Sequence, residues 1–283
     1  MEFPTKKNTS LVTKSFLLTQ LDFHEDIAWV TIDRPGDRNA INSSVIEEVE
    51  SILTLVENSA TRVIVFHGAG DIFFIGGADA VEMMNCSPDE AFDFSDRIQK
   101  LFNRMESSPL LLVSAIDGLC YGGGFEFTLA CDFRLAMESS RIGLPEVRVG
   151  IIPGGGGTQR LPKIVGKTKA MEIIMNGRLY KAKEALELGL INDIFSDDEM
   201  IPAIMNFLKP FLKNPQYALS NAKRAVQASQ NSEFADGLFV ERERFKKCFE
   251  ENFFVEEIVN QLKSGQMQTT QPLESIMKKN HKL

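Results

Sequence analysis

The chain has 283 residues, of which 43% are hydrophobic and 25% charged, an ordinary globular composition with room for one large domain or two small ones. The formal net charge of −8 argues against a surface whose main task is to bind nucleic acid or an anionic membrane. No apolar run approaches the roughly 18 residues of a transmembrane helix, and the four cysteines lack C-x-x-C spacing, so we expect a cytoplasmic protein with reduced thiols.

The first quarter of the chain predicts a hairpin, a helix and a buried strand. Residues 1–15 are polar, without arginine or an apolar h-region, so we expect a flexible extension and not a transit peptide. Residues 16–22 and 27–32 have the pattern of two short strands around a turn. Residues 44–47 fit the capping box of an amphipathic helix. The apolar run 62–66 is typical of a strand buried in a parallel sheet.

The same alternation of strand and helix continues to about residue 166. A Ser-Pro-Asp-Glu sequence at 87–90 predicts the start of a second capped helix, and residues 110–116 predict the next buried strand. Strands that alternate with helices, with glycine loops at the strand ends, indicate an α/β protein. Beyond residue 166 the pattern is mostly helical, with Gly177 and Gly189 in helix C-cap positions.

Two glycine loops are candidates for ligand binding. The sequence Phe-Phe-Ile-Gly-Gly-Ala-Asp occupies residues 73–79, and three glycines occupy 122–124. Glycine lets backbone N–H groups approach a ligand closely, although either loop alone also fits an ordinary turn. Together, the two loops would supply two backbone donors from different parts of the chain, which is what an oxyanion hole requires.

Two glutamates stand beside these glycines. Glu126 lies two residues after the last glycine of 122–124, and Glu146 follows Pro145 twenty residues later. Each fits an exposed helix position when taken alone, but the apolar neighbours of Glu126 predict a buried helix. A buried carboxylate is costly unless it is paired or functional. The pair therefore indicates acid–base chemistry next to an oxyanion hole.

Other catalytic chemistries find little support. The glycines at 154–157 do not fit a phosphate-binding loop, and we interpret them mainly as closely packed backbone. The three histidines, His24, His67 and His281, are too far apart in sequence to suggest a metal cluster, and we expect structural or surface roles for them. No metalloprotease motif or nucleophile elbow is present. Carboxylates and backbone N–H donors remain as the candidate catalytic groups.

Several motifs, in order and at matching spacing, resemble the crotonase family and most closely its enoyl-CoA hydratases. The resemblance covers about residues 16–195. The matching positions are Arg34-Pro35, Asn39-Ala40, Gly76 to Asp79, Ala115 to Gly118, Gly122 to Glu126, Cys131-Asp132, Pro145-Glu146, Gly150, Pro153-Gly154 and Gly157 to Leu161.

The resemblance implies an α/β crotonase fold, a spiral of ββα units followed by helices that build trimers, often paired into hexamers. On this basis residues 16–195 form the core domain, 196–263 the helical trimerisation region and 264–283 a weakly structured tail. The resemblance also implies a coenzyme A thioester as substrate, no metal, and no cofactor beyond the coenzyme A of the substrate.

The resemblance further implies a role for each site residue. The N–H groups of Gly76 and Gly123 would bind the thioester oxygen. The loop through Gly77, Ala78 and Asp79, together with Gly154, would lie along the acyl-CoA. Glu126 would act as the general base on water, and Glu146 as the general acid that protonates Cα.

Alternative functions stay open at this point. Relatives that only shift a double bond usually keep one carboxylate, so the presence of both favours a hydratase. Residues 255–263 depart from the usual family pattern, which keeps open an isomerase, decarboxylase or dehydratase acting on a specialised acyl-CoA or carrier-protein thioester. Some relatives bind RNA, but the net charge of −8 and the lack of a basic helix oppose that function here.

Overall fold

The computed structural model describes residues 16–267, which belong to two compact units, one that ends at Lys213 and one that begins at Asn214. The first unit holds every described strand, and the second is helical. The predicted extension at 1–15 lies outside the described residues, as does most of the predicted tail at 264–283.

The first unit is built around a six-stranded sheet. In spatial order, its strands are β1 (Thr19–His24), β2 (Ile27–Ile32), β3 (Val63–Gly68), β5 (Leu111–Ile116), β7 (Phe133–Met137) and β10 (Asp193–Phe195). Strand β1 pairs with β2 as the predicted antiparallel hairpin, and the remaining pairs are parallel. The central strands β3 and β5 are mostly apolar and almost wholly buried because both faces of the sheet are covered.

A second, smaller sheet forms from four short strands, three of which directly follow a strand of the first sheet. Its order is β4 (Phe73–Ile75), β6 (Leu119–Tyr121), β8 (Arg141–Gly143) and β9 (Tyr180–Lys181). Strands β3 and β4, β5 and β6, and β7 and β8 are thus successive pairs, each followed by helices. This repeat is the ββα unit that the family resemblance implies. Because β4, β6 and β8 run parallel, their carboxyl ends share one edge, where ligands bind in α/β folds.

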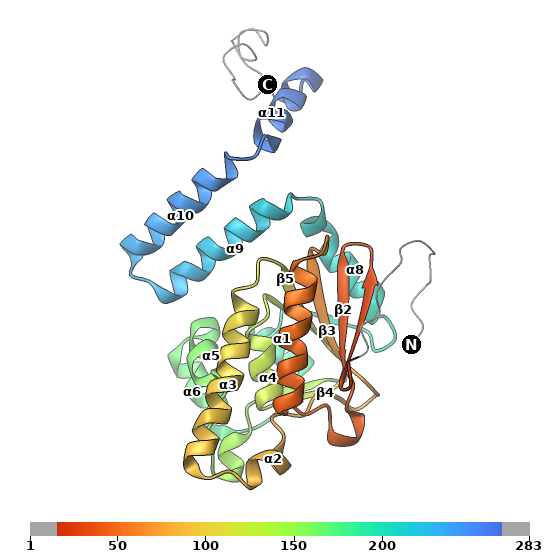
Figure 1. The fold of residues 1–283 in the computed structure, drawn as a ribbon, viewed down its shortest axis with the longest axis vertical. Helices are drawn as coiled ribbons and strands as arrows, with labels where there is room; N and C mark the ends of the chain where they lie inside the picture. The colour runs from red at the N-terminus through yellow and green to blue at the C-terminus, as the bar shows by residue number, and fades with distance from the viewer. Residues whose placement is uncertain (1–15, 268–283) are drawn as a thin grey trace. The chain divides into compact units, whose positions relative to one another are not determined.

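Helices cover the sheets of this unit, and α1 and α3 lie side by side (Figure 1). The α-helices are α1 (Ser43–Glu57), α2 (Ala80–Met84), α3 (Pro88–Glu106), α4 (Gly123–Leu129), α5 (Gly157–Val165), α6 (Lys167–Asn176), α7 (Ala182–Glu187) and α8 (Met200–Leu212), with short 3-10 helices η1 (Pro35–Asp37) and η2 (Glu146–Val149).

Of the two predicted capping boxes, one is present at the start of its helix and the other is not. Helix α3 begins with the predicted box, in which Ser87 and Glu90 exchange side-chain and backbone hydrogen bonds. The box predicted at 44–47 is wrong, because the side chain of Asn42 accepts the N–H of Val45 at 2.9 Å and caps α1 instead. The predicted apolar face of α1 is nevertheless buried, as expected from its helical spacing.

Aromatic side chains join α4 to its surroundings. The ring of Phe127 makes edge-to-face contacts with Phe66 on β3, at a centroid distance of 4.9 Å, and with Phe102 on α3, at 5.7 Å. Such contacts add to the free energy of burial. They fix α4 between the large sheet and α3, which sets the position of Glu126 on α4.

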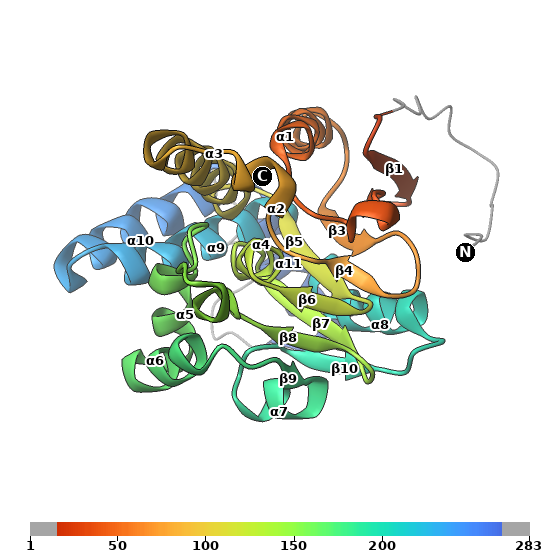
Figure 2. The ribbon, with the colours of Figure 1, turned by 90° about the horizontal axis from the view of Figure 1, so that it is seen from below.

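Helix α8 belongs to the first unit and lies on the far side of β7 from α4 (Figure 2). Phe207 and Phe211 of α8 contact the ring of Phe133, the first residue of β7, at centroid distances of 5.2 and 4.9 Å. The family resemblance groups α8 with the C-terminal helices, whereas packing groups it with the core. The boundary at residue 195 that the resemblance implies between the core domain and the helical region stays a prediction.

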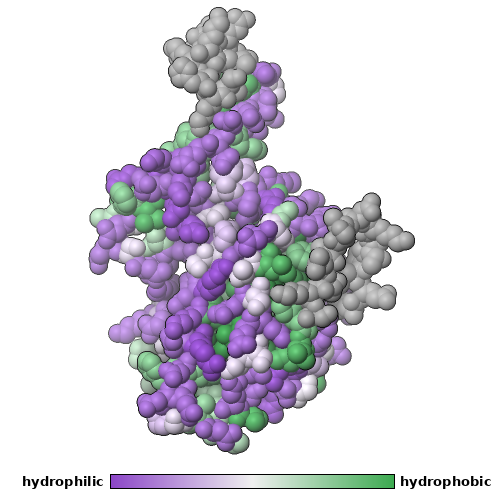
Figure 3. Space-filling view, viewed as in Figure 1, coloured by the Kyte–Doolittle hydropathy of each residue, from purple (hydrophilic) through white to green (hydrophobic). Residues whose placement is uncertain are grey.

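The second unit contains α9 (Gln216–Asn231), α10 (Phe234–Cys248) and α11 (Phe253–Ser264). Hydrophobic side chains are exposed along α10 (Figure 3), among them Phe234, which is 81% exposed, and Phe245, which is 66% exposed. Across residues 16–267, none of the helices has the length and apolar character needed to cross a membrane.

Candidate active site

A cavity of about 1030 Å³ lies where the loops after β4, β6 and β8 meet. All of the predicted site residues except Asp79 line this cavity. The three loops converge because the three short strands are parallel and end at one edge of their sheet. Residues far apart in the sequence are thereby brought into a single site.

Glu126 lies in the first turn of α4 and is only 3% exposed, as its apolar neighbours predict. Its Oε1 atom accepts the N–H of Gly157 at 2.7 Å. Burial raises the pKa of Glu126, and hydrogen bonds from the N–H groups of Gly157 and Gly155 and the charge of Arg160 act against that rise. These contacts favour the ionised carboxylate, which is the form that can accept a proton.

The glycines at 154–157 are packed around this carboxylate. A Cβ atom built on Gly155 would lie 2.9 Å from Oε2 of Glu126, and one built on Gly157 would lie 2.9 Å from Oε1. A side chain at either position would therefore have to displace the Glu126 carboxylate. The sequence predicts close packing here, but it does not reveal that the partner is the side chain of Glu126, because that contact joins residues about thirty positions apart.

Glu146 faces the same cavity from the start of η2, in different surroundings. Both of its carboxylate oxygens are shielded from solvent, and neither has a hydrogen-bond partner among the described residues. Burial, with a further contribution from the charge of Glu126, raises the pKa of Glu146 to about 7. At neutral pH Glu146 therefore carries a proton part of the time, and it can donate that proton.

The backbone donors differ from the predicted pair. The N–H of Gly76 donates to the carbonyl oxygen of Arg38 at 2.8 Å, so it is already engaged, and the predicted donor role of Gly76 is wrong. Sequence reasoning does not see this bond because Arg38 belongs to a distant turn. Gly76 still lines the cavity, and a side chain there would collide with Arg38.

Ala78 supplies the donor that Gly76 does not. The N–H of Ile41 donates to the carbonyl of Gly77 and the N–H of Asp79 donates to the carbonyl of Ile41, at 2.9 and 2.8 Å. Successive backbone groups of an extended segment point to opposite sides, so the N–H of Ala78 faces away from Ile41.

Gly123 brings a second backbone donor to the same place. A Cβ built on Gly123 would lie 3.0 Å from the Ala78 nitrogen, so the two residues are in contact. Neither N–H has a backbone acceptor within the described part of the chain. Together, the two groups form a pair of available donors next to both carboxylates.

Asp79 has a structural role. Its Oδ1 atom accepts the N–H groups of Val81 and Glu82 at 3.0 and 3.2 Å, which caps α2, and its Oδ2 atom lies 3.1 Å from Nη2 of Arg34. The side chain is turned away from the cavity, in contrast to the predicted role in substrate binding. It holds the loop that carries the Ala78 donor.

The cavity wall includes residues that sequence reasoning misses. Arg38 lies at its rim, and apolar side chains form much of the remaining surface. These apolar residues are Met83, Met84, Phe94, Ile98, Val149, Ile151 and Ile152. The only sequence signal for them is an apolar pattern that core residues share.

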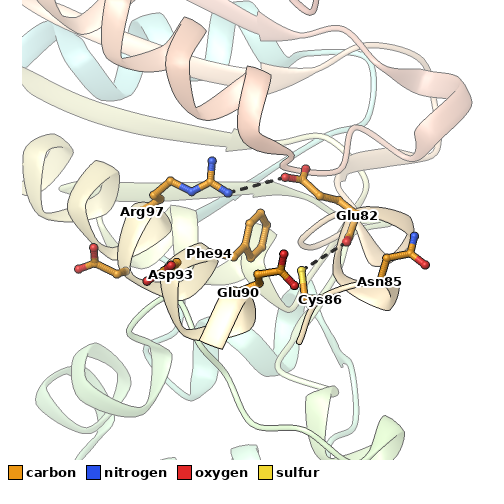
Figure 4. Close-up of a pocket in the computed structure, with 8 residues that line it drawn as sticks. Glu82, Asn85, Cys86, Glu90, Asp93, Phe94 and Arg97 are labelled. Atoms are coloured by element: carbon orange, nitrogen blue, oxygen red, sulfur yellow. Dashed lines mark hydrogen bonds and ion pairs between the residues drawn. The ribbon is translucent and has the colours of Figure 1, made fainter. Parts of the chain in front are cut away.

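A separate hollow of about 630 Å³ between α2 and α3 holds none of the predicted site residues (Figure 4). Four of its eight lining residues are acidic. The backbone carbonyl of Glu82 accepts the Sγ–H of Cys86 at 3.5 Å, and the Glu82 carboxylate lies 3.8 Å from Nη2 of Arg97. Across residues 16–267, no group of His, Cys, Asp and Glu side chains is arranged to hold a metal ion. The larger cavity, where both glutamates meet two donors, is the candidate active site.

Comparisons with known proteins agree on one family. The Enoyl-CoA hydratase/isomerase family profile matches residues 22–266. The chain is 33% identical over 230 residues to a crotonyl-CoA hydratase from Syntrophomonas wolfei, covering 81% of this chain and 88% of that protein. It is 34% identical over 224 residues to a short-chain-enoyl-CoA hydratase from Clostridium acetobutylicum, covering 79% and 86%. The crystal structure of an enoyl-CoA hydratase from Bacillus anthracis superposes with a TM-score of 0.82 at 30% identity, covering 88% of this chain and 96% of that one.

Proposed function

The chain belongs to the enoyl-CoA hydratase/isomerase family, with its crotonase fold, and within that family we propose that it hydrates 2-enoyl-CoA thioesters to 3-hydroxyacyl-CoA thioesters. One observation carries this proposal: two carboxylates face one cavity with different hydrogen-bonding surroundings. Glu126 accepts a backbone N–H, whereas both oxygens of Glu146 lack a partner among the described residues. Hydration requires one base and one acid, and these two settings supply them.

The thioester oxygen is expected to accept the N–H groups of Ala78 and Gly123. As hydroxide adds to Cβ, the electrons of the double bond move onto the thioester, and its oxygen becomes enolate-like. Two fixed backbone donors stabilise that negative charge more than they stabilise the neutral carbonyl of the substrate. The closeness of the two residues supports this role.

The two proton transfers of water addition are divided between the two glutamates. Glu126 takes a proton from water as the water oxygen forms its bond to Cβ and the carbon–carbon double bond is lost. Glu146 gives its proton to Cα, where the enolate electrons form the new C–H bond. Glu126 ends protonated and Glu146 ionised, so one proton must return through solvent before the next cycle. The proposed reaction uses no metal and no cofactor other than the coenzyme A of the substrate.

The test of this function is direct. Crotonyl-CoA added to the purified protein is expected to lose its enoyl-thioester absorbance, with formation of 3-hydroxybutyryl-CoA detected by chromatography. Persistence of the absorbance despite measurable thioester binding would contradict the proposal.

A second candidate is an isomerase, decarboxylase or dehydratase acting on a specialised acyl-CoA or carrier-protein thioester. The setting of Glu146 favours an isomerase among these, because a carboxyl with a pKa of about 7 can both accept and donate a proton. Such a reaction would need only Glu146. Conversion of a 3-enoyl-CoA to a 2-enoyl-CoA that survives Glu126→Gln, without hydration by the unmodified protein, would favour this second candidate.

The pH profile should report the state of Glu146. Because the acid form is required for hydration and its pKa is about 7, we expect kcat/KM to fall as pH rises through about 7. Well above that pH the fall approaches tenfold per pH unit, since each unit removes nine tenths of the remaining acid form. Steady-state kinetics on crotonyl-CoA between about pH 5.5 and 9 measures this. A profile that stays flat to pH 8 would show that Glu146 does not act as the acid.

We also propose that the protein is cytoplasmic and forms a homotrimer or a dimer of trimers, without nucleic-acid or membrane partners. The exposed phenylalanines of α10 support the assembly, since large apolar side chains are seldom left in water in such numbers. Sedimentation equilibrium should give three or six times the chain mass of 31.7 kDa.

A further inference from the structure

Two side chains of α3 hold one carbonyl of the glycine loop at 154–157. The Ser95 hydroxyl and the Gln99 side-chain amide each donate to the carbonyl oxygen of Gly154 at 2.7 Å. The Gln99 amide also donates to Ser95 Oγ at 3.2 Å. The two residues are one helical turn apart and so share a face of α3. A carbonyl oxygen has two lone pairs, and the Gly154 oxygen accepts one hydrogen bond for each of them.

The peptide between Gly154 and Gly155 transmits this contact to Glu126. All described peptide bonds are trans, so the Gly155 N–H points opposite to the Gly154 carbonyl. Gly155 lies against Glu126, since a Cβ built on it would be 2.9 Å from Oε2. Because α3 holds its carbonyl, this peptide has its N–H on the side away from α3, and the approach of Gly155 to the carboxylate acts to lower the pKa of Glu126.

The peptide between Gly156 and Gly157 has the same arrangement with different partners. The Gly156 carbonyl accepts the N–H groups of Gln159 and Arg160 at 3.0 and 2.9 Å, from the first turn of α5. The Gly157 N–H on the opposite side donates to Glu126 Oε1 at 2.7 Å. One donor to the carboxylate is thus fixed by helix backbone. The other is fixed by side chains, which can be replaced without breaking a helix.

We propose that Ser95 and Gln99 are positioning residues that orient the Gly154–Gly155 peptide and thereby keep the Glu126 carboxylate ionised and in place. Neither residue belongs to a motif that carried the family resemblance. Ser95 lies in the wall of the candidate active-site cavity and Gln99 lies outside it, and both act on Glu126 through the loop. The effect on turnover rests on the proposed function, whereas the effect on the titration of Glu126 does not.

The double variant Ser95→Ala with Gln99→Met removes both donors while keeping good helix-forming residues. Loss of a hydrogen bond to the charged form raises the pKa of a carboxyl, so we expect the apparent pKa of Glu126 to rise by about one unit. The acidic limb of kcat/KM should shift by the same amount, which lowers turnover about tenfold on that limb, with KM within about twofold. Each single variant should shift less, because the remaining donor still holds the carbonyl.

Difference infrared spectroscopy of the carboxyl stretch, with Glu126→Gln as the subtraction reference, reads this titration without any substrate. Lys100→Met is the matched control. Lys100 lies on the same helix with its side chain 69% exposed and pairs with Asp96, so this variant should leave the titration unchanged. Ser95→Thr combined with the native Gln99 keeps a hydroxyl and should titrate as the unmodified protein does.

The outcomes separate the two proposals. A double variant in which Glu126 titrates as in the unmodified protein overturns the positioning role. A shifted titration in a protein that does not hydrate crotonyl-CoA supports the positioning role and overturns the proposed function. If the double variant does not fold, the single variants decide, and an unmoved titration in both counts against the inference.

Discussion

Replacing Glu146 with glutamine is expected to lower kcat for hydration by about 10²–10⁴-fold, with thioester binding nearly unchanged. Glutamine matches the shape and volume of the side chain but has no proton to give to Cα. Because the carboxylate oxygens of Glu146 make no hydrogen bond with the described residues, replacing this side chain breaks no hydrogen bond that holds the fold together. Steady-state kinetics on crotonyl-CoA and calorimetric titration with a saturated acyl-CoA measure the two quantities.

Thermal unfolding distinguishes this loss from misfolding. The pKa of Glu146 in the folded protein, about 7, is raised above the usual value of 4.5, so the folded state holds its proton more tightly than the unfolded chain does. The stability that follows from this difference is present at low pH and is lost as pH rises through 7. Glutamine does not titrate, so above pH 7 the variant should melt at a temperature at least as high as the unmodified protein.

Glu126→Gln should lower kcat to a similar extent for a different reason. The amide cannot take a proton from water, and it presents either an oxygen or an NH2 group to the N–H of Gly157, which in the second orientation faces another donor. A near-normal rate in either variant would contradict the two-carboxylate mechanism. Retention of hydration by Glu126→Gln alone would leave Glu146 to do both proton transfers.

Local patterns in the sequence predict much of the fold. The hairpin, the apolar faces of α1 and α3, and the buried strands follow from periodicities of 2 and 3.6 residues, which depend only on neighbouring residues. Ser87 is recognisable as a cap for the same reason. The cap of α1 is not, because Asn42 and Ser44 are both good caps, and the choice between them depends on where the preceding loop enters the helix.

The site was predictable in its residue types and less so in its contacts. Burial of Glu126 follows from the phenylalanines on either side of it, which is local information. That Ala78 and not Gly76 offers a free N–H depends on which backbone groups pair with Ile41 and Arg38, residues more than thirty positions away. No motif contains that pairing. The link from Ser95 to Glu126 likewise passes through three segments that only the folded chain brings together.

Gly123→Ala is expected to lower kcat by about 10²–10³-fold, the usual effect of losing one oxyanion donor. The added methyl would lie 3.0 Å from the Ala78 nitrogen, in the space where the thioester oxygen is expected to accept both N–H groups. Gly123 begins α4 with an ordinary negative φ, so alanine is acceptable to its backbone and favours the helix. The neighbouring backbone must move by only a few tenths of an ångström.

Ligand binding by Gly123→Ala shows whether the loss of kcat comes from the oxyanion hole. A methyl group in the oxyanion hole should weaken binding of an enolate-like inhibitor far more than binding of a saturated acyl-CoA, because only the former places full negative charge against the two donors. Gly36→Ala is the matched control, since a methyl there meets no atom within 4 Å and the residue does not line the cavity. It should keep normal turnover. If Gly123→Ala retains more than about a third of normal kcat, less than 1 kcal/mol of transition-state stabilisation is lost, and the Ala78–Gly123 pair is not the oxyanion hole.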